Sequence, residues 1–133
     1  MWTYRGSVFD REIKDLFGFI YLITLPDGGK YIGKKNFYTL RRKRSFKKCV
    51  RAESNWREYY SSSEDLKALI DTCESKEGIQ REILELAISQ GHLNYLESKY
   101  LFQNNVLESP EYLNQNIMGR YFSKNVEKYS QVI

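Results

Sequence analysis

Two tyrosines on either side of a turn, and one glutamate further along the chain, are the residues whose types suggest chemistry. Tyr21 and Tyr31 stand ten residues apart, and Glu97 follows in a later segment. A tyrosine hydroxyl has an ordinary pKa of about 10, so it is a poor base at neutral pH unless nearby cations lower that pKa. Taken singly, each tyrosine would instead be interpreted as a half-buried strand residue. The choice between packing and chemistry therefore depends on the surroundings that the rest of the sequence predicts.

One segment of the sequence carries a concentrated positive charge. Residues 34–51 hold nine basic residues and no acidic one, and because the chain has a formal net charge of +4, the remainder carries −5. A positive segment on a mildly acidic body indicates a surface that faces a polyanion. The alternative is a solvated or disordered basic loop, although interleaved aromatic residues favour an ordered segment. The basic residues are Lys34, Lys35, Arg41, Arg42, Lys43, Arg44, Lys47, Lys48 and Arg51.

The two tyrosines are predicted to lie on the two strands of a β-hairpin. The apolar run 19–25 is typical of a strand, and residues 30–33 are typical of the returning strand. Between them stands Pro26-Asp27-Gly28, in which proline presets φ at the first corner and glycine accepts the left-handed third position.

The length of the turn decides which way the tyrosines point. A three-residue loop places Tyr21 opposite Gly33 and Ile23 opposite Tyr31, so both tyrosines share one face. Gly33 then leaves a gap beside the Tyr21 ring. A two-residue loop would put the tyrosines on opposite faces, but the Pro-Asp-Gly order favours the three-residue form.

The other elements are predicted from periodicity and capping. We expect a cap over the core from residues 1–17, and a helix after the three serines 61–63. Residues 79–87 favour a strand over a short helix, because a turn-like segment precedes them. A further helix should run from Gly91 to about Asn104. A last helix is expected within 117–129, with Ile117, Tyr121 and Val126 pointing inward.

Glu97 occupies an unusual position on the helix that begins near residue 91. At about 100° per residue, it falls inside the apolar stripe that contains Leu93, Leu96 and Tyr100. A carboxylate buried there without a partner would cost several kcal/mol, so it should bind a cation or a donor, or occupy a cleft. The alternative is a glutamate at the edge of the stripe whose carboxylate reaches into water.

Length and composition set the broad class of the protein. With 133 residues, 41% of them hydrophobic and 29% charged, the chain is typical of one globular domain. No apolar run approaches the roughly 20 residues of a membrane span, and no secretory signal pattern opens the chain. Its two cysteines suggest neither a disulfide nor a zinc framework. We therefore expect a cytoplasmic protein.

Several of these features together resemble the GIY-YIG nuclease family. They are the Ile20-Tyr21 pair, the later Tyr31-Ile32-Gly33, the helical glutamate and the stretch ESNWREYYSSS at 53–63. The spelling is most similar to homing-type and stand-alone GIY-YIG endonucleases of tailed bacteriophages, over about residues 2–118. Two positions differ from the family pattern: the first-motif glycine is displaced to Gly18, and Ser61 stands where related sequences usually have glycine.

The resemblance implies an α/β (α+β) domain with a three-stranded antiparallel sheet flanked by helices. The boundaries would be 1–17 for the cap, 18–118 for the catalytic core and 119–133 for a C-terminal helix or tail. It also implies hydrolysis of DNA phosphodiester bonds with one Mg²⁺ or Mn²⁺ ion per active site.

The family's functional residues carry over by position. Tyr21 and Tyr31 match the motif tyrosines, either of which would be the base, and Glu97 matches the metal-binding glutamate. Lys34 matches a frequent lysine, and Arg41 matches the arginine of the first helix, with Arg42, Arg44 and Arg57 as rivals. Gly33 and Asn114 would support the site. The expected DNA-contacting residues are Lys35, Arg42, Lys43, Arg44, Lys47, Lys48 and Arg51.

Two other classes of function stay open. The chain could be a nucleic-acid-binding module without catalysis, which explains the basic run but leaves Glu97 unexplained. It could also be a protein-interaction domain on a retired nuclease scaffold. Because 133 residues leave little room for a separate DNA-recognition region, we expect low intrinsic specificity, or specificity supplied by a homodimer, a protein partner or a larger parent chain. Nicking and double-strand cleavage are equally compatible with the sequence.

Overall fold

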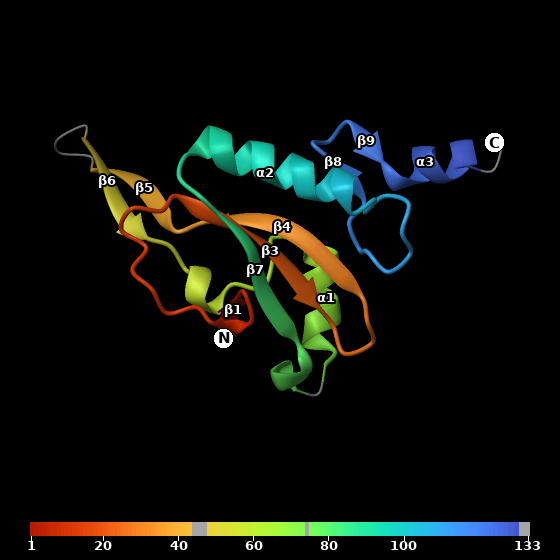
Figure 1. The fold of residues 1–133 in the computed structure, drawn as a ribbon, viewed down its shortest axis with the longest axis horizontal. Helices are drawn as coiled ribbons and strands as arrows, with labels where there is room; N and C mark the ends of the chain where they lie inside the picture. The colour runs from red at the N-terminus through yellow and green to blue at the C-terminus, as the bar shows by residue number, and fades with distance from the viewer. Residues whose placement is uncertain (44–47, 74, 131–133) are drawn as a thin grey trace.

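The computed structural model describes residues 1–43, 48–73 and 75–130 and contains a mixed β-sheet (Figure 1). Its strands are β1 (Trp2–Tyr4), β2 (Ser7–Val8), β3 (Gly18–Thr24), β4 (Lys30–Asn36) and β7 (Gln80–Ala87), in the order β2-β1-β7-β3-β4. β3 pairs antiparallel with β4 and β7, whereas β1 runs parallel to β7. The expected three-stranded antiparallel sheet is therefore the β7-β3-β4 part, which two N-terminal strands extend.

The N-terminal segment was expected to cap the core, and only part of it does so. Residues 2–8 instead lengthen the sheet, because Arg5 and Gly6, with φ angles of 52° and 85°, turn the chain back between β1 and β2. Phe9, Ile13 and Leu16 are then buried against the core, as a cap would be.

The β3–β4 hairpin has the predicted register. Tyr21 pairs with Gly33 and Ile23 with Tyr31, and the loop is the three-residue form. Gly28 has a φ of 94°, the left-handed conformation that this turn requires of its third residue. A Cβ added to Gly33 would lie 2.6 Å from Cζ of Tyr21, so the Tyr21 ring can cross β4 only where a glycine stands.

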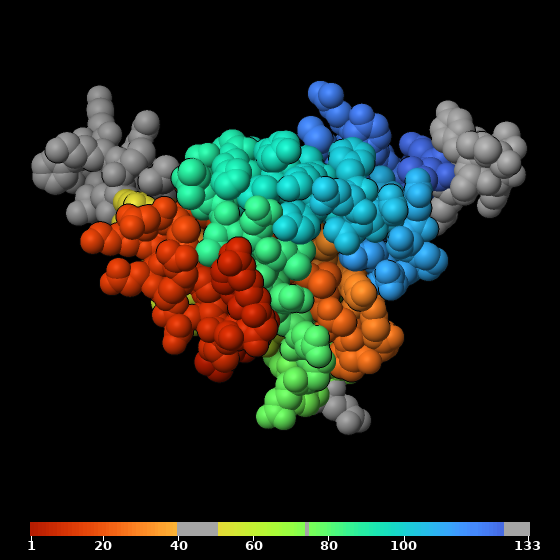
Figure 2. Space-filling view, in the orientation of Figure 1, coloured from red at the N-terminus to blue at the C-terminus, as the bar shows by residue number. Residues whose placement is uncertain are grey.

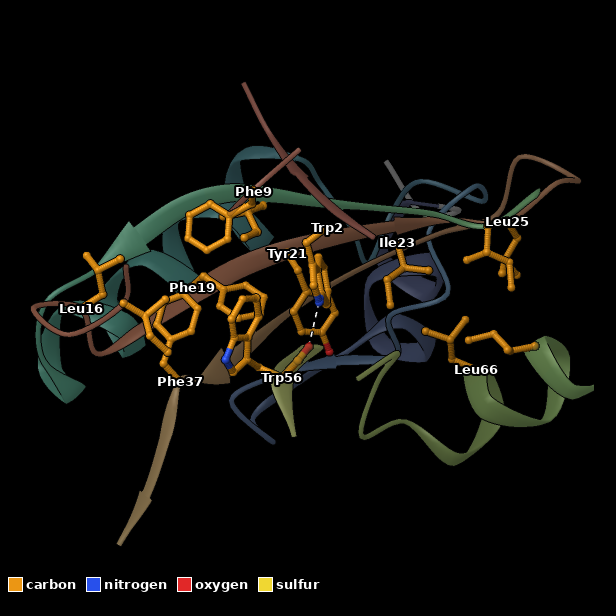
Figure 3. Close-up of a cluster of buried hydrophobic side chains, with 14 residues drawn as sticks. Trp2, Phe9, Leu16, Phe19, Tyr21, Ile23, Leu25, Phe37, Trp56 and Leu66 are labelled. Carbon is orange, nitrogen blue, oxygen red and sulfur yellow. Dashed lines mark hydrogen bonds between the residues drawn. The ribbon is translucent and has the colours of Figure 1, made fainter. Parts of the chain in front are cut away.

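Different hydrophobic cores cover the two faces of the sheet. On one face, an aromatic cluster includes Tyr21 and Phe19 and packs against η1 (Trp56–Glu58) and α1 (Glu64–Asp71). Figure 3 shows Tyr21 in this cluster, with the Trp2 indole N–H donating to the carbonyl oxygen of Trp56 at 2.7 Å. On the other face, α2 (Gln90–Gln103) lies along the sheet over an aliphatic cluster (Figure 1).

Most of the predicted local elements are confirmed. Residues 80–87 form a strand, and η2 (Lys76–Gly78) precedes it. The hydroxyl of Ser63 accepts from the backbone N–H of Leu66 and caps α1. Likewise Ser89 caps α2 by accepting from the N–H of His92.

The prediction of a helix over 117–129 is wrong in its first half. The chain there forms a small hairpin of β8 (Asn116–Ile117) and β9 (Tyr121–Phe122), and α3 (Ser123–Ser130) begins only afterwards. Met118 and Gly119 have φ angles of 59° and 66°, which an α-helix excludes. Tyr121 is consequently exposed, whereas Ile117 is buried and Val126 packs against the aliphatic core.

The basic segment folds as a ribbon and not as the helix that the resemblance implied. β5 (Tyr38–Lys43) and β6 (Lys48–Glu53) pair antiparallel as a separate hairpin, which extends away from the sheet (Figure 1). Arg41 therefore lies on a strand. The buried ring of Phe37 and the hydrogen bond from the N–H of Ser54 to the carbonyl oxygen of Phe37, 2.8 Å, fix the base of the ribbon. The aromatic and β-branched residues near that base favour strands over helix.

Candidate active site

A pocket of about 270 Å³ opens beside β4, the edge strand of the sheet, and groups from both faces line it. Tyr31 reaches it from the aromatic face, and Glu97 reaches it from α2 on the opposite face. The start of α1 contributes Ser63 and Asp65, and residues 113–116 with Met118 form the remaining wall. A cleft that straddles a sheet edge thus brings together two of the residues that the sequence singled out.

Glu97 is a partly buried carboxylate that faces a cation. The Nζ of Lys34 lies 3.7 Å from Oε1 of Glu97 and donates to Oδ1 of Asn94 at 2.7 Å. The Glu97 side chain is 25% exposed. Burial raises the pKa of Glu97 above its ordinary value, and the Lys34 ammonium opposes that rise. The expectation that Glu97 meets a cation and occupies a cleft is confirmed.

The two tyrosines differ in access. Tyr21 is 1% exposed, and its hydroxyl lies against the backbone of Gly33. Burial strongly raises the pKa of Tyr21, and Tyr59 raises it further. Tyr31 is only partly buried and lines the pocket. Burial raises the pKa of Tyr31 as well, followed by Tyr59 and Glu97. A substrate in the pocket can therefore touch Tyr31, while Tyr21 supports it from behind.

Ser61 lies beside the candidate site, although in the sequence it stands out only as a departure from a family glycine. It is 1% exposed, and its hydroxyl accepts from the backbone N–H of Ser63 at 2.9 Å. Hydrogen bonding by the Ser61 side chain lowers the pKa of Tyr21 and that of Tyr31. A buried hydroxyl that favours the phenolate form opposes the effect of burial. The residue pattern gave no direct signal for this contact.

Arg81 was not predicted to support the site, although it holds the segment that carries Ser61. This arginine is 8% exposed and its Nη1 donates to the carbonyl oxygens of Arg57 and Tyr59, at 3.0 and 2.9 Å. Its guanidinium also lies over the rings of Trp2 and Tyr60, and burial lowers the pKa of Arg81. Arg81 therefore fastens residues 57–60 to strand β7, just before Ser61.

Asn114 supports the site by completing the edge of the sheet. Its Nδ2 donates to the carbonyl oxygen of Ile32 at 2.8 Å, and its Oδ1 accepts from the N–H of Ile32 at 3.1 Å. Neighbouring backbone bonds join Lys30 to Glu111 and Leu113. The Asn114 amide thus takes the place of a further strand beside Ile32, directly between Tyr31 and Gly33.

The predicted DNA-contacting residues fall into two groups. Lys35 and Arg51 line a second, larger depression of about 590 Å³ between β4, the ribbon and the start of α2, which Lys34, expected to be catalytic, also borders. Lys35 lies over the Tyr59 ring and Arg51 over the Tyr38 ring, with Nζ and Cζ 4.1 and 3.6 Å from the ring centroids. Arg44 and Lys47 lie outside the described residues, as do the side chains of Arg41, Arg42, Lys43 and Lys48.

The rival arginine Arg57 is engaged elsewhere. Its Nε lies 3.1 Å from Oε1 of Glu53, and its guanidinium covers the Trp56 ring. It does not line the pocket that holds Tyr31 and Glu97. The cation that the described side chains place beside Glu97 is Lys34.

The acidic groups of the pocket fit a hard cation better than a zinc ion. Within residues 1–43, 48–73 and 75–130, no three His, Cys, Asp or Glu side chains gather as a ligand set. Glu97 offers one carboxylate in a polar pocket, which suits an ion that keeps several waters and takes other oxygens from a substrate. Asp65 lines the same pocket, where its Oδ2 accepts from Nε2 of Gln115 at 3.2 Å.

Comparison with known proteins gives one family match. The model of the family described as "Putative endonuclease segE, GIY-YIG domain" matches residues 2–117. No curated protein and no solved structure gives a significant match, so the assignment rests on the family model. Across the part of the chain that the structure describes, none of the helices combines the length and apolarity needed to cross a bilayer.

Proposed function

From the premise that the chain belongs to the GIY-YIG endonuclease family, we propose that it hydrolyses DNA phosphodiester bonds with one Mg²⁺ or Mn²⁺ ion. The observation that carries this proposal is the meeting of Tyr31 and Glu97 in one polar pocket, with Lys34 beside the carboxylate. Hydrolysis needs a deprotonated water, a cation for the charge on the phosphoryl oxygens and help for the leaving oxygen.

Each of these tasks has a candidate group. Glu97 would hold the divalent cation, which when bound neutralises charge on the phosphate and stabilises the leaving oxygen. Tyr31 receives the proton of the attacking water, because Tyr31 lines the pocket while Tyr21 is enclosed. Ser61 favours the phenolate of Tyr31 against the effects of burial, Tyr59 and Glu97, which raise the pKa of Tyr31. Lys34 adds positive charge beside Glu97. Tyr21 keeps the Tyr31 ring and Ser61 in place.

The basic ribbon supplies the proposed grip on the DNA backbone. Arg41 would clamp the scissile phosphate, and the basic residues from Arg42 to Lys48 would contact phosphates further along. Lys35 and Arg51 border the depression that joins the ribbon to β4. Binding should then weaken steeply with salt, by about 0.9 in the log–log slope for each phosphate contact. Neutralising Lys43, Lys47 and Lys48 together should flatten that slope, and an unchanged slope would contradict this part of the proposal.

A matched pair of variants tests the proposed reaction. Glu97→Gln removes the carboxylate while keeping its shape, and supercoiled plasmid in Mg²⁺ should then stay uncut although DNA binding persists. Glu111→Gln is the control, because Glu111 is also paired with a β4 lysine, Lys30, at 3.7 Å but lies outside the pocket. The Glu111→Gln control should cut the plasmid at the parental rate. A chelator should abolish cleavage by the parent and by the control.

Three outcomes of that assay are decisive. Cleavage by folded Glu97→Gln protein at the parental rate would overturn the catalytic assignment. Parental protein that binds plasmid but never cuts it would favour the binding module without catalysis. The ratio of nicked to linear product, followed against protein concentration, shows whether one chain nicks or a pair cuts both strands.

A further inference from the structure

The hairpin of β8 and β9 places an exposed apolar side chain at the rim of the candidate active site. Met118 stands at its tip, is 63% exposed and lines the same pocket as Tyr31 and Glu97. In Figure 2 the blue C-terminal segment that contains this hairpin projects beyond the surface of α2. Packing into the core does not account for a large apolar side chain in so exposed a place. Another role for it is therefore worth seeking.

The conformation of Met118 is also costly. Its φ of 59° lies in the left-handed region, which glycine and asparagine adopt far more readily than methionine. A backbone held in such a region at the edge of a pocket is a common feature of functional sites. The sequence therefore keeps a side chain at a position where a smaller residue would relieve strain.

The tip is attached to the rest of the protein by a buried side chain and by hydrogen bonds. The buried side chain of Ile117 anchors it to the aliphatic core, and the N–H of Gly119 donates to Oδ1 of Asn116 at 3.1 Å. The N–H of Arg120 closes the turn on the carbonyl oxygen of Ile117, also at 3.1 Å. Behind the tip, Asn114 holds β4. The chain that leads to Met118 is thus tied, through Asn114, to the strand that carries Tyr31.

We propose that this hairpin is a DNA-distorting wedge, in which Met118 inserts between bases next to the phosphodiester held at Tyr31 and Glu97. The inference rests on the proposed nuclease function, because a scissile phosphate in this pocket brings its flanking nucleotides against the pocket wall. Unbranched apolar side chains that enter a base step unstack it and bend the duplex. Methionine suits this task, because its flexible thioether fits irregular gaps.

The charge next to Met118 favours DNA over a protein partner. Arg120 is exposed in the same turn, and Lys124 follows at the start of α3. These cations lie beside an apolar tip, as expected of a segment that meets a phosphate backbone and bases together. Distortion of the duplex would also give the enzyme a preference for easily unstacked steps without any base-specific hydrogen bond.

The topology of closed circular DNA tests the wedge without knowledge of the cleavage site. Nicked plasmid is sealed with DNA ligase in the presence of increasing Glu97→Gln protein, which binds but should not cut. Insertion between bases unwinds the duplex, so the sealed circles should show a lowered linking number that saturates with protein. Adding Met118→Gly to this protein should remove more than half of the change at equal occupancy, as measured by gel shift.

Two further proteins complete the experiment. Tyr95→Ala in the Glu97→Gln background is the control, because Tyr95 is similarly exposed, at 64%, but does not line the pocket; it should keep the full change. Met118→Asn, which also tolerates a positive φ, replaces the glycine variant if that variant does not fold. An equal linking-number change with and without Met118, or no change at saturation, overturns the wedge. Parental protein that still cuts plasmid in that case leaves the nuclease proposal intact.

Discussion

Tyr21 and Tyr31 share one face of the β3–β4 hairpin, with ring centroids 6.3 Å apart, yet they belong to different regions of the molecule. Tyr21 stands on a central strand and lies among aromatic rings, including those of Trp2 and Tyr59. Tyr31 stands on the edge strand, where the sheet ends and the pocket begins. The difference teaches that strand position, and not residue type, separates the side chain that can meet a substrate from the one that supports it.

The two regions are also built differently. The aromatic core consists of packed large rings, and Arg81 holds the segment before Ser61 against it by hydrogen bonds. The edge region is closed by polar groups, chiefly the Asn114 amide on Ile32 and the Lys34–Glu97 pair. Rigid packing behind a polar opening is the arrangement that holds reactive groups in a fixed geometry.

The largest expected effect separates the two tyrosines. Tyr31→Phe should lower the cleavage rate by about 10²- to 10⁴-fold, the usual loss for a general base, with stability changed by less than about 0.5 kcal/mol. Tyr21→Phe should instead cost about 0.5–1.5 kcal/mol of stability, because it removes a hydrogen bond of the buried Ser61 hydroxyl, and should lower the rate far less. Single-turnover cleavage and urea unfolding of both variants measure this. A larger rate loss in Tyr21→Phe would reverse the assignment of roles.

The second prediction concerns the contact between the Tyr21 ring and the backbone of Gly33, where the aromatic core meets the edge strand. Gly33→Ala would place a Cβ 2.6 Å from Cζ of the Tyr21 ring, and the neighbouring rings of Trp2 and Tyr59 leave that ring no room to move. Overpacking of this kind should cost about 1–3 kcal/mol of unfolding free energy.

The control for this change is Gly91→Ala. Gly91 lies in the first turn of α2, where an added Cβ meets nothing within 4 Å. Because alanine is the better helix former, this variant should be stabilised by up to about 1 kcal/mol. Denaturant midpoints that place both variants on the same side of the parent would contradict the packing argument.

The hairpin and Glu97 were predictable because local rules govern them. The Pro-Asp-Gly turn fixed the register, and from it the pairing of Tyr21 with Gly33 follows by alternation. The position of Glu97 in an apolar stripe predicted a cation or a cleft, and Lys34 and the pocket provide both. Residue pattern suffices where the deciding contacts lie within one element or one turn.

The missed features depend on contacts between distant segments. Ser61 lies near the tyrosines in a segment whose preceding residues are held by Arg81 of β7, which is distant in the sequence. The helix expected around Arg41 is a ribbon because β5 pairs with β6, a segment further along the chain. The last helix was predicted to begin too early, because Met118 has a positive φ that helix propensity does not predict for methionine. Tertiary context decided each of these cases.

A smaller effect is expected at Ser61, which joins the two regions. Ser61→Ala removes the hydroxyl that lowers the pKa of Tyr31, so that pKa should rise further and the phenolate should become scarcer at neutral pH. Loss of about one hydrogen bond to a charged group predicts roughly a 10-fold lower cleavage rate. The rising limb of the pH–rate profile, which follows deprotonation of Tyr31, should move to higher pH. A merely structural role of Ser61 would not produce this shift. A lower rate with an unmoved profile would assign Ser61 to packing alone.

The smallest effect concerns the pH dependence of stability in the absence of divalent ions. The folded pKa of Glu97 is raised, chiefly by burial, so the ionised carboxylate is less favourable in the folded than in the unfolded protein. The protonated Glu97 carboxyl therefore contributes to stability. That contribution is present below the unfolded pKa of about 4.3 and is lost as pH rises through the folded pKa. Glutamine does not titrate. The stability of Glu97→Gln relative to the parent should therefore increase with pH across that interval and then level off.

The size of that increase should stay below about 1 kcal/mol, because the side chain is partly exposed and Lys34 offsets the burial. Urea midpoints of the parent, Glu97→Gln and the Glu111→Gln control between pH 4 and 8 provide the measurement. Added Mg²⁺ should stabilise the parent and the control, since an ion that binds only the folded state shifts unfolding by mass action, and should leave Glu97→Gln unchanged. An advantage of the glutamine variant that shrinks as pH rises would show that Lys34, and not burial, dominates the edge region.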